Sequence, residues 1–253
     1  MVLASKAGVP HPDAGDHSPL SAIGLRRSVE GSLRRLGTDH IDLFYLHQPD
    51  RRAPLQETLT AIVDLVREGS IGALGVSNYS AWQISELNHV ADTVGAPRPV
   101  VAQQLFNMVA RRVEDEYLEF ARTTGILTMV YNPLAGGLLT GRHTFTAAPL
   151  AGRFGTSKLA TMYQKRYWDP RLFAAVESLA TVADSAGLSL VELSLRWLLS
   201  HVDVGAILLG ASHVEQLRAN IEAASHGPLS AELVDACDNA CSSLRGPMPA
   251  YCR

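Results

Sequence analysis

The feature that most constrains this fold is a regular alternation between short apolar runs and longer amphipathic segments. Six runs of four to six residues are mostly apolar, as strands buried on both faces of a parallel sheet should be. They lie at residues 2–5, 41–46, 71–76, 100–105, 126–130 and 206–209. This pattern predicts an α/β fold with a parallel sheet, either an open doubly wound sheet or a closed (β/α)8 barrel.

Several of the intervening segments begin with recognisable helix start signals. A serine followed three residues later by Glu or Gln can form a capping box, and a serine before proline also marks a helix start. These signals are Ser18 before Pro19, Ser80 with Gln83, Ser189 with Glu192, and Ser212 with Glu215. Further helices are expected near residues 170–186 and 230–244, before an irregular tail.

Polar side chains at the ends of the predicted strands favour the barrel. His47, Ser77 with Asn78, Gln103 and Tyr131 each fall at the carboxyl end of a different strand. A barrel gathers its active site at that end. A doubly wound dinucleotide fold would instead place G-x-G-x-x-G after the first strand, and no such motif follows residues 2–5.

Composition excludes several other classes of protein. The chain has 253 residues, 47% of them hydrophobic, and a net charge of -3, which fits a single globular domain over residues 1–253. No basic stripe with interleaved aromatics indicates nucleic acid binding, and no apolar run reaches the roughly 18 to 20 residues of a membrane span. No cleavable leader is evident, so we expect a cytoplasmic protein.

The cysteines do not indicate a metal site. Cys237, Cys241 and Cys252 are an odd set without the histidine or carboxylate pattern that would complete a metal site. We expect buried or half-buried thiols.

The segment ILLGASHVEQLRAN, residues 207–220, predicts an anion site. The backbone leaves a strand through Gly210 and enters a helix that Ser212 is expected to cap. Unpaired N–H groups and the helix dipole both favour a phosphate at such a helix start. The sequence therefore predicts a phosphorylated cofactor.

Four motifs together resemble the aldo-keto reductases. They are LFYLHQPD at 43–50, GALGVSNYS at 72–80, YNPLAGGLLTGR at 131–142 and ILLGASHVEQLRANIEA at 207–223. Their order and spacing match the branch that includes potassium-channel β-subunits and related bacterial reductases, and the resemblance covers essentially the whole chain. It implies a (β/α)8 barrel that binds NADP(H), with NAD(H) not excluded.

The resemblance also implies where the cofactor binds. The nicotinamide carboxamide would be held by Ser77, Asn78 and Gln103, and Tyr131 would stack on the ring. Asn132, Pro133, Leu134, Gly137 and Arg142 would line the pyrophosphate, and Arg153 could add charge for phosphate. The adenosine end would be held by Gly210, Ser212, Gln216 and Asn220. These residue types suit the roles, since amides match a carboxamide and arginine matches phosphate.

The same resemblance implies the catalytic residues. Lys6 matches the family's lysine and His47 its histidine, while the aspartate and the tyrosine acid belong to a segment before Lys6. The resemblance therefore implies an N-terminally truncated barrel, with about six of eight strands and no first βαβα segment. Tyr45, two residues before His47 on one strand, is expected to pack in the core rather than replace the acid.

Three functions remain open. The first is NADP(H)-dependent reduction of an aldehyde or ketone, impaired if the tyrosine and aspartate are absent. The second is a non-catalytic cofactor-binding or regulatory subunit, which could self-associate or bind a partner chain through an open barrel edge. The third is a non-redox lyase or dehydratase that uses Lys6 and His47. The carbonyl pocket is expected in loops rich in aromatics, which include Phe106, Phe145, Phe154, Tyr163, Tyr167 and Trp168.

Overall fold

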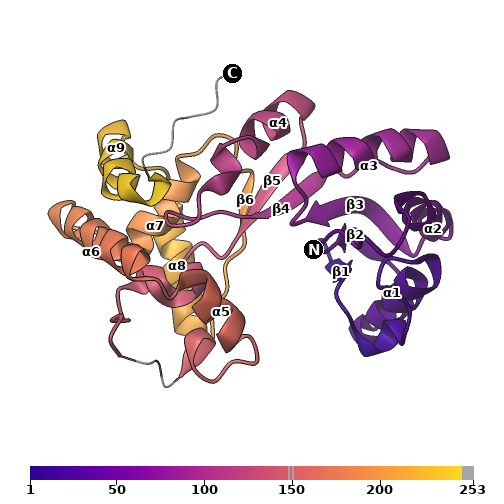
Figure 1. Cartoon of the computed structure of the whole chain (residues 1–253), viewed down its shortest axis with the longest axis horizontal. Coiled ribbons are helices and arrows are strands. Elements are labelled where there is room, and N and C mark those ends of the chain that lie inside the picture. The colour runs from indigo at the N-terminus through magenta and orange to yellow at the C-terminus, as the bar shows by residue number, and fades with distance from the viewer. Residues whose placement is uncertain (148, 150, 247–253) are drawn as a thin grey trace. The chain divides into compact units, whose positions relative to one another are not determined.

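A computed structural model describes residues 1–147, 149 and 151–246, and within them six strands form one sheet (Figure 1). The strands are β1 (Ala4–Ala7), β2 (Ile41–Leu46), β3 (Ile71–Ser77), β4 (Val101–Leu105), β5 (Leu127–Tyr131) and β6 (Ala206–Ile207). Their order in the sheet is their order in the chain, β1-β2-β3-β4-β5-β6.

This strand order distinguishes between the two predicted architectures. A doubly wound sheet reverses its strand order at a switch point, whereas a barrel adds each new parallel strand beside the last. The pairs β1–β2, β2–β3 and β3–β4 are all parallel, and the order never reverses. The chain therefore has the strand order of a (β/α)8 barrel, as the sequence predicts.

Nine α-helices lie within the described residues. They are α1 (Ala22–Leu36), α2 (Leu55–Arg67), α3 (Ala81–Val94), α4 (Tyr117–Thr124), α5 (Ala160–Tyr167), α6 (Pro170–Ser185), α7 (Leu190–Leu199), α8 (Val214–Ser225) and α9 (Ala231–Ala240). Short 3-10 segments are η1 (Pro12–Ala14), η2 (Arg112–Glu114), η3 (Ala135–Thr140), η4 (Gly152–Phe154) and η5 (Ser242–Arg245).

Two of the four predicted helix starts are confirmed. Ser80 and Gln83 form the capping box of α3, and the Ser189 side chain accepts a hydrogen bond from the Glu192 N–H at the start of α7. The Ser18 start is wrong because α1 begins three residues later. There Ser21 is the cap, and the Ser18 hydroxyl instead donates to Asp50 Oδ2 at 2.5 Å.

The predicted Ser212 cap is also wrong. The N-cap of α8 is His213, which makes no side-chain capping bond. The Gln216 side chain reaches back from the first turn, and its Oε1 accepts from the Ser212 N–H at 3.0 Å. Ser212 therefore lies one residue before the cap.

Strand boundaries differ by up to two residues from the predicted ones. The strand predicted at 2–5 is β1 at Ala4–Ala7, because Met1 and Val2 are exposed and unpaired, and β3 extends by one residue to Ser77. The run at 206–209 shortens to β6, Ala206–Ile207, although the Leu208 N–H still donates to the Val130 carbonyl. The predicted 230–244 helix ends at Ala240 and continues as η5.

The described chain divides into two compact units. Unit 1 comprises Met1–Gln104 and Glu116–Met129, and unit 2 comprises Leu105–Asp115 and the described residues from Val130 to Gly246. In unit 1, α1 packs on α2 and α2 on α3, and Phe44 and Leu46 on β2 and Ile62 on α2 are completely buried. In unit 2, α7 packs on α6 and α8, and Trp197 on α7 is completely buried.

The expected thiols at Cys237 and Cys241 are buried, and burial raises their pKa values to about 12 and about 11. Cys252 lies outside the described residues. No single described helix is both long and apolar enough to cross a membrane; α6 and α7 together meet those two criteria, with a bend of 91° between them. No described group of three or more His, Cys, Asp or Glu could hold a metal ion.

Candidate active site

Unit 1 brings the two predicted catalytic residues together. Lys6 lies on β1 in register with Tyr45 on β2, and His47 follows β2 directly. The positive charge of Lys6 is close enough to lower the pKa of His47, although burial is the larger cause of that shift. Burial likewise lowers the pKa of Lys6. His47 is therefore neutral at pH 7, and Lys6 is a more acidic ammonium than a free lysine.

The backbone of His47 is held from both sides. Its N–H donates to the Ala7 carbonyl of β1 at 2.7 Å, and its carbonyl accepts from Asn78 Nδ2, after β3, at 2.9 Å. Gly8 permits this close approach, since a Cβ there would lie 3.1 Å from the His47 nitrogen. The backbone of His47 is thus fixed just beyond the carboxyl end of β2.

The residues predicted to hold a carboxamide also lie together in unit 1. Ser77 and Gln103 are in register on β3 and β4, and both are buried. Asn78 has a φ of 60°, an unusual value for a non-glycine residue. In this conformation its N–H donates to the Gln103 carbonyl at 3.2 Å, and its Nδ2 donates to Ser77 Oγ at 3.1 Å. Asn78 therefore links the ends of β2, β3 and β4.

Tyr45 is packed in the core, as predicted. Its side chain is 1% exposed, its hydroxyl donates to Met129 Sδ at 3.5 Å, and burial raises its pKa. The same sulfur lies 3.6 Å from Gln103 Nε2. A phenol with a raised pKa is a weaker acid, so Tyr45 is poorly suited to proton donation.

Unit 2 holds the remaining predicted cofactor residues. Tyr131 ends β5 with a pKa that burial raises, and Asn132 follows it with a φ of 62°. The Asn132 carbonyl accepts from Asn107 Nδ2 at 2.9 Å, and the Tyr163 hydroxyl lies 3.4 Å from Asn132 Oδ1. Asn107 is completely buried, and none of the sequence motifs identifies it as a partner of Asn132. Its position two residues after β4 was the available signal.

The predicted pyrophosphate segment is an irregular turn. It contains Pro133, Leu134 and η3, where Gly136 and Gly137 have φ values of 71° and 111°. Gly136 is required because a Cβ there would lie 2.6 Å from Tyr163 Cδ1. Arg142 is exposed after this turn, and its Nε donates to Thr140 Oγ1 at 3.2 Å.

Arg153 lies close to Gly210, one of the residues predicted to bind the adenosine end of the cofactor. Its Nη1 donates to the Tyr163 hydroxyl at 2.6 Å, and its guanidinium lies 5.4 Å from the centroid of that ring. A Cβ on Gly210 would lie 3.4 Å from Arg153 Nη2. A cation therefore lies beside the backbone that leads into α8. Ser212 and Gln216 are exposed there, and Asn220 is buried within α8.

The aromatic residues expected to line a substrate pocket mostly pack against one another. Phe154 contacts His143, Tyr163 and Trp168 with ring centroids 5.2, 6.1 and 5.3 Å away. Phe106, Phe154, Tyr163 and Tyr167 are all buried, whereas Phe145 is exposed. Most of this aromatic surface therefore stabilises unit 2 rather than lining an open pocket.

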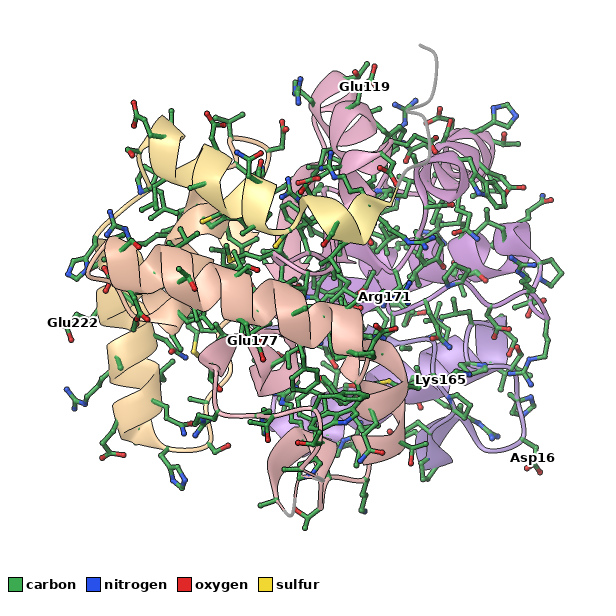
Figure 2. The ribbon with its side chains drawn as sticks, turned by 60° about the vertical axis from the view of Figure 1, so that its left-hand side comes forward. Asp16, Glu119, Lys165, Arg171, Glu177 and Glu222 are labelled. Atoms are coloured by element: carbon green, nitrogen blue, oxygen red, sulfur yellow. The ribbon has the colours of Figure 1, made fainter. Side chains whose placement is uncertain are left out.

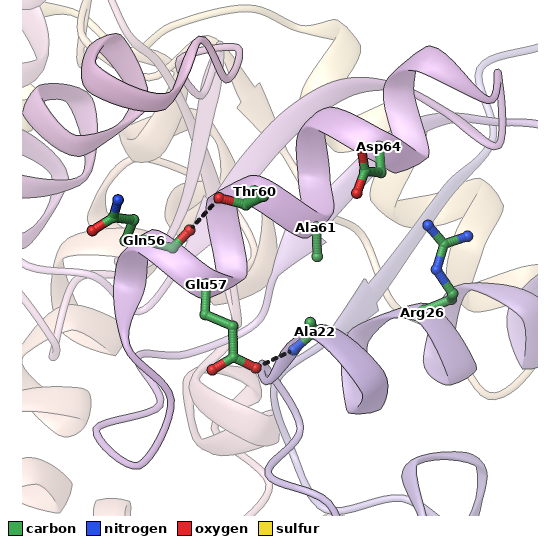
Figure 3. Close-up of a pocket in the computed structure, with 7 residues that line it drawn as sticks. All are labelled: Ala22, Arg26, Gln56, Glu57, Thr60, Ala61 and Asp64. Atoms are coloured by element: carbon green, nitrogen blue, oxygen red, sulfur yellow. Dashed lines mark hydrogen bonds between the residues drawn. The ribbon is translucent and has the colours of Figure 1, made fainter.

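A surface hollow of about 260 Å³ lies elsewhere, between α1 and α2 of unit 1 (Figure 3). Its lining residues are Ala22, Arg26, Gln56, Glu57, Thr60, Ala61 and Asp64. Glu57 Oε1 accepts from the Ala22 N–H at 2.7 Å, and Arg26 pairs with Glu68 through two hydrogen bonds. The Ala22 N–H and the Arg26 guanidinium therefore already have partners, and no predicted site residue lines the hollow.

The donor set of each unit, taken by itself, fits one part of a nicotinamide cofactor. Unit 1 offers a serine hydroxyl and two amide side chains at adjacent strand ends, which matches a primary carboxamide. Unit 2 offers Arg153 against a glycine at the entrance of a helix, which matches a phosphate.

Comparison with known proteins supports the same assignment. The family model described as "Aldo/keto reductase family" matches residues 1–241. Human "Aldo-keto reductase family 7 member A3" is 36% identical over 246 residues, covering 92% of this chain and 74% of that protein. Mouse "Aflatoxin B1 aldehyde reductase member 2" is also 36% identical, covering 92% of this chain and 67% of that protein.

The chain is also similar in sequence to potassium-channel β-subunits. The "Probable voltage-gated potassium channel subunit beta" of Arabidopsis thaliana is 32% identical over 235 residues, covering 92% of this chain and 71% of that protein. The sequence match, the strand order and the residues at the strand ends agree, and the chain belongs to the aldo/keto reductase family.

Proposed function

We propose that the chain is an NADP(H)-dependent reductase of an aldehyde or ketone. The observation that carries this proposal is the grouping of Lys6, His47 and Asn78 at the carboxyl ends of adjacent strands. The family match and the aldehyde reductases among the relatives support the reaction type. NADPH, when bound, would supply a hydride to the carbonyl carbon.

The carboxamide end of the cofactor would lie against Ser77, Asn78 and Gln103. Tyr131 offers an aromatic face for the nicotinamide ring. The phosphates would be held by Arg142, Arg153 and the turn that contains Gly137, with Gly210, Ser212, Gln216 and Asn220 toward the adenosine.

Two side chains of the chain would act on the carbonyl oxygen. Neutral His47 can donate a ring N–H to this oxygen, which orients and polarises the carbonyl group. The Lys6 ammonium stabilises negative charge on the oxygen as the carbon is reduced. Because burial lowers the pKa of Lys6, its ammonium is also the described group best suited to donate the proton that completes the alcohol.

The test is whether the purified chain oxidises NADPH in the presence of 4-nitrobenzaldehyde. The reaction is monitored as the loss of nicotinamide absorbance. Lys6→Met removes the ammonium and His47→Gln removes the imidazole, so each is expected to lower kcat at least about a hundredfold. Lys165→Met and His89→Gln are matched controls, because Lys165 on α5 (Figure 2) and His89 on α3 are exposed. Both controls should retain the wild-type rate.

Two results would contradict the proposal. Turnover that survives both active-site substitutions would remove Lys6 and His47 from the reaction. NADPH binding without any oxidation would favour a cofactor-binding subunit instead.

A further inference from the structure

Lys6 contacts an aromatic ring that has no part in the proposed reaction. Lys6 Nζ lies over the Tyr45 ring, 5.0 Å from its centroid. The two residues are in register on β1 and β2 and so point to the same face of the sheet. A lysine ammonium within about 6 Å of a ring centroid is attracted by the negative face of the ring.

The Tyr45 ring is held rigidly in this position. Gly75 on β3 is in register with Tyr45, and a Cβ there would lie 2.7 Å from ring atoms Cδ1 and Cε1. The Tyr45 hydroxyl is anchored to Met129 Sδ at 3.5 Å. The absence of a side chain on Gly75 thus lets the ring lie flat against β3, and the ring is 1% exposed.

The ionisable groups beside Lys6 come from one neighbouring strand and the residue that follows it. Among the residues that the structure describes, Tyr45 on β2 lies under the Lys6 ammonium, and His47 directly after β2 is close enough to sense its charge. On the opposite face of β1, Ser5 Oγ donates to Ser32 Oγ of α1 at 3.0 Å, so that helix packs away from Lys6. Both His47 and Tyr45 are neutral at pH 7, so of these two described neighbours it is the Tyr45 ring, through its negative face, that favours the cation.

We propose that Tyr45 is a positioning residue whose aromatic face holds the Lys6 ammonium in its protonated form beside His47. The inference rests on the proposed role of Lys6 in carbonyl reduction. Burial favours the neutral amine, whereas the ring favours the cation, so the two effects act on Lys6 in opposite directions.

Removing the aromatic face should therefore lower the pKa of Lys6 further. The expected fall is about one unit, a tenfold change in proton affinity that corresponds to about 1.4 kcal/mol. Tyr45→Phe keeps the face and loses only the hydroxyl, so it should leave the pKa of Lys6 close to the wild-type value. Tyr45→Met fills the space with a flexible chain that has no aromatic face, so it should show the fall.

The lysines of this chain make the measurement direct. They are Lys6, Lys158 and Lys165, and reductive methylation with ¹³C-formaldehyde labels them together with the Met1 amino group. A Lys6→Arg sample identifies the Lys6 methyl signal. In the wild-type chain this signal is expected at higher field than the signals of Lys158 and Lys165, because the methyl groups lie over an aromatic ring. Titration of the ¹³C shift then gives the pKa of Lys6.

Two results would overturn the proposal: a Lys6 signal without a ring-current shift in the wild-type chain, or equal Lys6 pKa values in wild type and Tyr45→Met. The first measurement needs no substitution at Tyr45, so it decides the question even if Tyr45→Met fails to fold. Both are made without cofactor, which separates them from the proposed function. If the chain gives the expected NMR results but oxidises no NADPH, the proposed function is refuted while the Lys6–Tyr45 contact is established.

Turnover supplies a further readout. If Lys6 acts as the ammonium, kcat falls as the pH rises through its pKa. The fall in kcat is expected at lower pH in Tyr45→Met than in the wild-type chain. In Tyr45→Phe, which keeps the aromatic face, the pH profile of kcat is expected to match that of the wild-type chain. A pH profile unchanged by Tyr45→Met would argue against the positioning role.

Discussion

Asn78 Nδ2 lies 2.9 Å from the carbonyl oxygen of His47, so the residue that follows β3 holds the residue that follows β2. Asn78 makes this bond from a left-handed backbone conformation, with a φ of 60°. Strain of this kind persists only where surrounding bonds enforce it. The proposed cofactor residue and the proposed catalytic histidine are therefore parts of one hydrogen-bonded group.

The strain and the hydrogen bonds at Asn78 can be measured separately. Asn78→Gly loses the side-chain bonds to His47 and Ser77 but adopts a positive φ freely, whereas Asn78→Ala loses the bonds and keeps the strain. Urea unfolding should show Asn78→Ala to be less stable than Asn78→Gly by about 1 kcal/mol. Equal stabilities would mean that the left-handed backbone is not enforced.

Gly136 should tolerate alanine much less well than Gly187. Both have positive φ values, 71° and 67°, so the backbone cost of alanine is similar. A Cβ at Gly136 would meet the Tyr163 ring at 2.6 Å, whereas nothing lies within 4 Å at Gly187. Gly136→Ala is expected to lower the free energy of unfolding by about 1 to 3 kcal/mol more than Gly187→Ala. Similar losses would contradict the packing of Tyr163 against η3.

His201 should make the fold sensitive to acid. Its ring packs against Trp197 and Phe106, burial lowers its pKa, and its buried Nε2 has no hydrogen-bond partner among the described residues. Below about pH 6.5 the unfolded chain binds a proton that the folded chain does not, so stability falls as pH falls toward the folded pKa.

The neutral variant His201→Gln tests this effect. Its stability relative to the wild-type chain is expected to improve by about 1 kcal/mol between pH 8 and pH 5, as measured by urea unfolding at both pH values. A difference that does not change with pH would show that His201 has the same pKa in the folded and unfolded chains.

Arg153 should contribute to the preference between cofactors. It lies beside Gly210 at the entrance of α8, where the adenosine end is proposed to bind. If its guanidinium contacts the additional phosphate of NADPH, Arg153→Met will weaken NADPH binding at least about tenfold and NADH binding much less. Arg171→Met is the control, since Arg171 on α6 is exposed (Figure 2) and pairs with Asp169. Equal weakening for both cofactors would assign Arg153 to a phosphate that they share.

The sequence predicted the elements that carry strong local signals. The apolar run at Ile41–Leu46 coincides with β2, and the Ser80–Gln83 capping box starts α3. Three helices were not predicted as elements, namely α2, α4 and α5. Their N-cap residues are Pro54, Glu116 and Leu159, none of which makes a side-chain capping bond. A helix that lacks a capping residue has no start signal in the sequence.

The positions of the predicted site residues at strand ends can be read from the sequence, but the contacts between these residues cannot. Alternation along β2 places Tyr45 and His47 on one face, yet the Lys6–Tyr45 contact depends on the register between β1 and β2. Arg153 lies 57 positions from Gly210 in the sequence, and no local pattern predicts that contact. Ser212 was misassigned because α8 starts one residue later, at the His213 cap, and Gln216 rather than Glu215 accepts from the Ser212 N–H.

Cofactor binding is tested most directly by titrating the chain with NADPH while nicotinamide fluorescence is monitored. Saturable binding is expected below about 1 mM cofactor. Binding should weaken in Ser77→Ala, which removes a carboxamide partner, and stay unchanged in Ser178→Ala, an exposed serine on α6. If the chain is folded by circular dichroism and gives no fluorescence change with NADPH, it is not an NADPH-dependent reductase.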